Sequence, residues 1–107
     1  LLISDCEGYE IELFTPAVAA ELAKHDLLIE CHDCLNNVII TTLQERFEKT
    51  HVITVIESID DAKKVRTYDF PELASCDEAA KLFILSERRP ITMNWLCLTS
   101  RISSQGR

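Results

Sequence analysis

Short apolar runs alternate with amphipathic stretches along most of the chain. The apolar runs have the length and the Leu, Ile and Val content of β-strands, and they cover residues 1–5, 26–32, 51–57 and 93–98. The stretches between them space their apolar residues as helices do, and they cover residues 9–14, 17–24, 35–49 and 76–87. This β-α-β-α-β-α-β pattern predicts an α/β fold, layered on a sheet of four strands.

Local signals sharpen the helix predictions. Thr15 and Pro16 are typical of an N-cap and a first helical position, so the helix at 17–24 begins there, with Val18 and Leu22 on its apolar face. Ser75 and Glu78 form a capping-box pattern before the helix at 76–87. The apolar stripe expected for the helix at 35–49 consists of Val38, Ile39, Leu43 and Phe47.

The remaining segments are assigned by their polarity and by their position along the chain. Residues 58–74 are predicted to be a polar connection, and residues from 99 onward a polar tail. The chain opens on Leu1, Leu2 and Ile3 without a polar lead-in, so we expect a buried first strand and a cut made inside a fold. Both outer strands of a four-stranded sheet would then have exposed edges.

Charge and composition exclude several classes of protein. The 107 residues carry a net charge of −7, which argues against binding to nucleic acid or to anionic lipid. No apolar run has the roughly 18–20 residues that span a bilayer. Gly8 and Gly106 are the only glycines, so a glycine-rich phosphate turn is absent. The odd count of five cysteines favours a reducing, cytoplasmic location.

Polar side chains gather where the first two predicted strands end. Asp5, Glu7 and Glu10 follow the first strand, while Glu30 and His32 end the second. If these strands are adjacent and parallel, both clusters lie on one rim of the sheet, where open α/β sheets bind ligands, and Asp5, Glu7, Glu30 and His32 come together there. The alternative interpretation is that Asp5 and Asp33 cap helices and that His32 is a solvated loop residue.

Several other polar residues have a possible structural role as well as a possible functional one. Cys31 and Cys34 have the C-x-x-C spacing of a zinc knuckle or a redox pair, but no second ligand pair accompanies them. No metal site is therefore assigned. His25 and His51 flank strands and are expected on the surface. Asn36 and Asn37 are interpreted as helix caps rather than as a phosphate site.

The first polar cluster also carries a family resemblance. Asp5-Cys6-Glu7-Gly8-Tyr9-Glu10 resembles the D-x-E-G-x-E signature of FkbM-type methyltransferases, which use S-adenosylmethionine and act mostly on oxygen. The end of the second strand, Glu30-Cys31-His32, resembles that family's E-x-H. Residues 89–96 resemble its closing segment, in which the last strand returns antiparallel. The resemblance covers residues 1–100 and leaves 101–107 as a flexible tail.

The resemblance implies the C-terminal half of a Rossmann-like methyltransferase sheet. It assigns catalysis to Asp5, Glu30 and His32, with Asp5 and His32 as alternative acceptors of a hydroxyl proton. It assigns substrate binding to Glu7 and Glu10. The cofactor is S-adenosylmethionine, but its glycine-rich binding half is missing, so activity of this chain alone is not expected.

Two alternatives stay open beside the enzyme fragment. The first is a non-catalytic binding or dimerisation module, in which an exposed sheet edge pairs with a second copy. The second is a zinc or redox protein that uses Cys31 and Cys34. The methyl acceptor, a small molecule or a glycan, is not identified by any residue.

Overall fold

A computed structural model describes residues 1–89 and 91–102. The chain divides into two compact units. The sheet unit contains residues 1–57 together with the described residues from Met93 onward, and the helical unit is the described part of Ser58–Thr92. Within the described residues no helix has the length and apolar character needed to cross a membrane.

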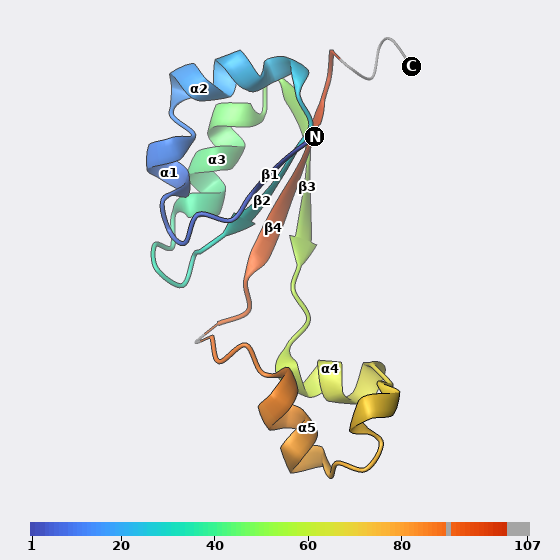
Figure 1. The fold of residues 1–107 in the computed structure, drawn as a ribbon. Coiled ribbons are helices and arrows are strands. Elements are labelled where there is room, and N and C mark those ends of the chain that lie inside the picture. Colours follow the sequence, from blue (N-terminus) through green and yellow to red (C-terminus); the bar gives the residue numbers. More distant parts are fainter. Residues whose placement is uncertain (90, 103–107) are drawn as a thin grey trace. The chain divides into compact units, whose positions relative to one another are not determined.

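The sheet unit is built on four strands: β1 (Leu2–Ser4), β2 (Leu27–Cys31), β3 (His51–Glu57) and β4 (Asn94–Ser100). Their order across the sheet is β1-β2-β4-β3 (Figure 1). β1 runs parallel to β2, whereas β4 is antiparallel to both of its neighbours. The predicted four-stranded α/β fold and the antiparallel last strand are therefore confirmed, with β4 inserted between β2 and β3.

Three α-helices and a short 3₁₀ helix connect the first three strands, and the α-helices gather on one side of the sheet (Figure 1). α1 (Glu10–Leu13), α2 (Pro16–Glu21) and the short 3₁₀ helix η1 (Leu22–Lys24) lie between β1 and β2, and α3 (Ile39–Phe47) lies between β2 and β3. Apolar side chains from these helices pack against one face of the strands. The core formed in this way contains Phe14, Ala19, Leu27, Ile29, Cys31, Ile39, Leu43, Phe47, Leu96 and Leu98.

The opposite face of the sheet is only partly covered. Ile3, Leu28, Cys97 and Thr54 lie in register across the four strands and so share this face. Ile3 is 63% exposed, and Val52 and Ile56 on the same face are about half exposed. The prediction of a buried first strand is therefore wrong, because β1 is an edge strand and helices pack against only one face.

Two helix predictions are corrected, one in its buried face and one at its N-terminal end. Thr15 caps α2 as expected, because its Oγ1 accepts a hydrogen bond from the Val18 amide at 3.3 Å. However, Val18 is exposed, and Ala19 occupies the buried face instead. α3 begins at Ile39 rather than at residue 35, because the Asn36 side chain accepts from the Val38 amide and holds the preceding residues in turns. Val38 is consequently exposed.

The helical unit contains α4 (Asp61–Thr67), the 3₁₀ helix η2 (Pro71–Leu73) and α5 (Glu78–Leu85). The prediction that residues 58–74 form only a polar connection is therefore wrong. Asp60 caps α4 by accepting from the Lys63 amide at 2.8 Å. α5 is capped by Asp77 rather than by Ser75, so it begins two residues later than predicted. Pro90 and residues 103–107 lie outside the described part of the chain, whereas Thr99 and Ser100 belong to β4 rather than to a tail.

Candidate functional site

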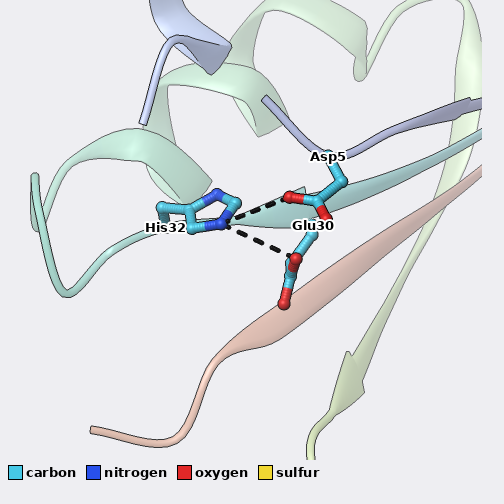
Figure 2. Close-up of side chains that lie close together, drawn as sticks. All are labelled: Asp5, Glu30 and His32. Carbon is cyan, nitrogen blue, oxygen red and sulfur yellow. Dashed lines mark ion pairs between the residues drawn. The ribbon is translucent and has the colours of Figure 1, made fainter. Parts of the chain in front are cut away.

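The predicted polar cluster forms at the carboxyl ends of β1 and β2. Because these strands are parallel neighbours, with Ser4 opposite Ile29, the residues that follow them lie at the same edge of the sheet. Nε2 of His32 lies 3.4 Å from Oδ1 of Asp5 and 3.6 Å from Oε2 of Glu30 (Figure 2). The carboxylate of Glu7 also lies 3.4 Å from this nitrogen. The structure therefore brings together the residues that sequence analysis selected.

A tight turn after β1 delivers the acidic side chains. The Tyr9 amide donates a hydrogen bond to the Cys6 carbonyl at 3.2 Å, and the two central residues of this turn, Glu7 and Gly8, both have positive φ. A Cβ atom added at Gly8 would lie only 2.9 Å from Cδ1 of Leu35. Glycine is thus required here both by the backbone conformation and by the close packing of the loop.

Glu10 is completely buried and holds the imidazole of His32. Its Oε1 atom bonds to Nδ1 of His32 and also accepts a hydrogen bond from the Gly8 amide at 3.3 Å. Since a carboxylate only accepts, Nδ1 donates to Glu10, and Nε2 is the ring nitrogen that faces the other carboxylates. The resemblance assigns Glu10 to substrate binding, whereas its position is that of a residue that orients another side chain.

Nε2 of His32 is left without a hydrogen bond. The His32 side chain is 1% exposed, and Nε2 has no hydrogen-bond partner among the residues that the structure describes. The interpretation of His32 as a solvated loop residue is therefore wrong. Leaving a buried polar atom unpaired costs about 1–3 kcal/mol, so such an atom calls for an explanation.

The carboxylates around this nitrogen differ strongly in exposure. The side chain of Glu30 is 8% exposed, whereas those of Asp5 and Glu7 are 50% and 72% exposed. The cluster is therefore closed by Glu30 and Glu10 on the protein side and reaches water through Asp5 and Glu7. Such an arrangement can bind a cation or accept a proton from a hydroxyl group.

The neighbouring cysteines do not join this cluster. Cys31 is fully buried in the core, and its Sγ lies 3.8 Å from the carbonyl oxygen of Ile29. Burial raises the pKa of the Cys31 thiol to about 12, which disfavours the thiolate that binds metals and exchanges disulfides. Within the described residues, the sole group of three or more side chains with metal-binding geometry is Asp5, Glu30 and His32. The zinc and redox hypotheses for Cys31 and Cys34 are therefore not supported.

Two further residues act in the fold rather than as ligands. The carboxylate of Asp33 accepts from the Ile40 amide at 3.2 Å in the first turn of α3, and burial raises the pKa of this carboxyl. Asn36 accepts from the Val38 amide in the turns before α3. The N-cap of α3 is Val38, without a side-chain cap hydrogen bond, so the interpretation of Asn36 and Asn37 as the caps of this helix is wrong. Sequence analysis missed the bond between Glu10 and His32, because the two residues are 22 positions apart and meet only through the turn at Gly8.

Comparisons of the chain with protein families, with curated proteins and with solved structures find no match. The interpretation of the cluster therefore depends on its own geometry and on the resemblance of its residues to a known signature.

Proposed function

We propose that this chain is the acceptor-side half of an S-adenosylmethionine-dependent O-methyltransferase. The observation that carries the proposal is the buried imidazole of His32, whose unpaired Nε2 faces the carboxylates of Asp5 and Glu30. These are the residues to which the resemblance assigns catalysis. The antiparallel course of β4 agrees with the closing strand that the resemblance implies.

In the proposed reaction, S-adenosylmethionine would supply the methyl group to the hydroxyl oxygen of the acceptor, and its sulfur would keep the electron pair of the broken C–S bond and leave as S-adenosylhomocysteine. The hydroxyl proton moves to Nε2 of His32. Glu10 holds the ring by its other nitrogen, and the carboxylates of Asp5 and Glu30 stabilise the imidazolium that results.

The cofactor would be bound by a further part of the protein. The sequence contains no glycine-rich turn that could bring the backbone close to the adenosine and methionine groups of S-adenosylmethionine. The partly uncovered sheet face and the outer edge of β1 offer apolar and hydrogen-bonding surface to such a part. This supports the proposal that the sheet of four strands is one half of a larger sheet.

The test uses the natural protein that contains this chain together with any sequence that precedes it. We expect calorimetry to detect binding of S-adenosylmethionine, and a panel of hydroxyl compounds to yield S-adenosylhomocysteine. His32→Gln should lower turnover by about 10²–10⁴-fold and leave cofactor affinity unchanged. The matched control, His25→Gln, changes an exposed histidine outside the cluster. Failure of the natural protein to bind the cofactor would contradict the proposal.

A dimerisation module is the second candidate function. It is favoured by the exposed edge strand β1, in which Leu2 and Ile3 are 37% and 63% exposed and which pairs with β2 on one side only. A second copy could pair with this edge by backbone hydrogen bonds. Sedimentation equilibrium of the chain would then give a dimer that Ile3→Lys converts to a monomer, whereas a monomer at all concentrations excludes this candidate.

A further inference from the structure

We propose that Asp5, Glu30 and His32 bind a divalent first-row transition metal ion. One atom of each side chain lies within 4.8 Å of the others, and the two distances from Nε2 are 3.4 and 3.6 Å. Nitrogen and oxygen ligands that bind a common ion at about 2.0–2.2 Å are separated by about 3–4 Å from each other. The three side chains therefore already have nearly the spacing of a coordination shell (Figure 2).

The unpaired nitrogen is the independent observation that distinguishes this cluster from an ordinary group of surface acids. His32 is buried, and its Nε2 lies 3.4 Å from Oδ1 of Asp5 and 3.6 Å from Oε2 of Glu30 without a hydrogen bond to either. A metal ion placed there would bind the lone pair of the deprotonated nitrogen together with the two carboxylates.

The bond between Glu10 and His32 fits the same role. Histidines that bind metals usually donate their other ring N–H to a carboxylate, which fixes the ring and leaves the correct nitrogen free. Glu10 provides this carboxylate from a fully buried position at the start of α1. The residue that would orient the ligand is thus present before any ion is bound.

The set of ligand atoms indicates the class of ion. One imidazole nitrogen with two carboxylates is less suited to Mg²⁺ or Ca²⁺, which prefer oxygen ligands alone, and it contains no thiolate. Imidazole and carboxylate together suit Mn²⁺, Fe²⁺ and Zn²⁺. Glu7 is 72% exposed and lies 3.4 Å from Nε2, so it can serve as a further ligand or leave that position to water or substrate.

The metal site is inferred from geometry and does not depend on the proposed methyl transfer. If both hold, Nε2 of His32 binds the ion and cannot also take the hydroxyl proton. The ion would then activate the acceptor hydroxyl as a Lewis acid, in place of the imidazole. Binding of the metal alone and binding of S-adenosylmethionine are measured separately, so the failure of one proposal is distinguishable from the failure of the other.

The test is a titration of the full chain with Mn²⁺, in which electron paramagnetic resonance reports the free ion. We expect one bound ion per chain. Asp5→Asn and Glu30→Gln should each weaken binding at least tenfold, and His32→Gln should abolish it. Because Asp5 is half exposed, Asp5→Asn retains the fold, which circular dichroism verifies for every variant. His25→Gln and Glu12→Gln, which change exposed residues outside the cluster, should bind as the parent does.

Competition then identifies the class of ion. Zn²⁺ should displace Mn²⁺ at comparable concentration, and Mg²⁺ should not. The proposal is overturned if no Mn²⁺ or Zn²⁺ binds, as a doubly protonated His32 that balances the carboxylates by itself would cause. It is equally overturned if Asp5→Asn and Glu30→Gln bind Mn²⁺ as tightly as the parent chain, or if Mg²⁺ displaces Mn²⁺ as well as Zn²⁺ does.

Discussion

Two buried histidines lie at opposite ends of the strands of the same sheet, and they differ in how many of their ring nitrogens are hydrogen-bonded. β2 and β3 are both antiparallel to β4 and therefore run in the same direction. His51 begins β3, at the amino-terminal edge, whereas His32 follows β2, at the carboxyl-terminal edge. Nδ1 of His51 bonds to the Thr50 hydroxyl and Nε2 donates to the His25 carbonyl, each at 2.8 Å. His32 has only one nitrogen bonded.

Burial alone therefore does not identify a functional histidine. The edge that contains His51 is also well bonded around Ser100, whose hydroxyl donates to the Ala23 carbonyl at 2.6 Å and whose amide donates to Asp26 at 2.8 Å. The hydrogen bonds at this end of the sheet join distant segments of the chain and so stabilise the fold. At the end of the sheet that contains His32, the buried Nε2 atom has no hydrogen bond and lies among carboxylates. Such an atom adds little to stability and is suited to binding a ligand.

The largest expected effect is a loss of stability at the bonded edge. His51→Ala removes the two partly buried hydrogen bonds of a buried imidazole and its edge-to-face contact with the ring of Phe47, whose centroid is 5.1 Å away. The free energy of unfolding should fall by about 2–4 kcal/mol, measured by urea denaturation. His25→Ala is the control, because the hydrogen bond from His51 is accepted by the backbone carbonyl of His25, which this variant retains. Equal effects of the two variants would break the distinction between the edges.

At the other edge, the expected effect is on binding. Glu10→Gln keeps the shape of the side chain and an acceptor for Nδ1 of His32 but removes the negative charge. Affinity for Mn²⁺ should fall by about 10–100-fold while the fold is retained, because the partner of a metal-binding histidine tunes its basicity. Glu12→Gln, on the same helix but exposed, is the matched control. An unchanged affinity in Glu10→Gln would remove Glu10 from its positioning role.

A smaller effect is expected from the turn that carries Glu7. Gly8→Ala forces a residue with a Cβ atom into φ +99° and into contact with Leu35. This should cost about 1–2 kcal/mol of stability. Leu35→Ala combined with Gly8→Ala should recover only part of the loss, since it relieves the contact and not the backbone strain. Full recovery in urea denaturation would show that packing alone explains the glycine.

The smallest effect is expected for alkylation of Cys31, a core residue near the cluster. Cys31 is fully buried and its pKa is raised by burial, so iodoacetamide at pH 8 should leave it unlabelled in the folded chain. Mass spectrometry should detect its label only after unfolding in urea. Rapid labelling of Cys31 in the folded protein would reopen the redox alternative.

Sequence patterns predicted the elements that depend on local signals. The strand at 51–57 is correct, because a run rich in Val and Ile marks a strand without reference to the rest of the chain. The position of β4 between β2 and β3 depends on pairing over long distances, so the apolar pattern could not reveal it. α4 was missed because its capping Asp60 and its charged residues resemble those of a loop.

The candidate site was predicted as far as strand ends define it. Asp5, Glu30 and His32 were selected because parallel neighbouring strands end at the same edge of a sheet. The roles of Glu10 and His51 could not be predicted. His51 was expected on the surface and is instead buried against Phe47, because the residues that cover it are contributed by distant segments.

The most direct test of the account follows both histidines in one experiment. Long-range ¹H–¹⁵N correlation spectra report which ring nitrogen of each histidine carries a proton or binds a metal. During titration with Zn²⁺, we expect the resonance of Nε2 of His32 to shift and neither nitrogen of His51 to change. A spectrum in which His32 does not respond, or in which His51 responds equally, would contradict the claim that the unpaired nitrogen marks a binding site.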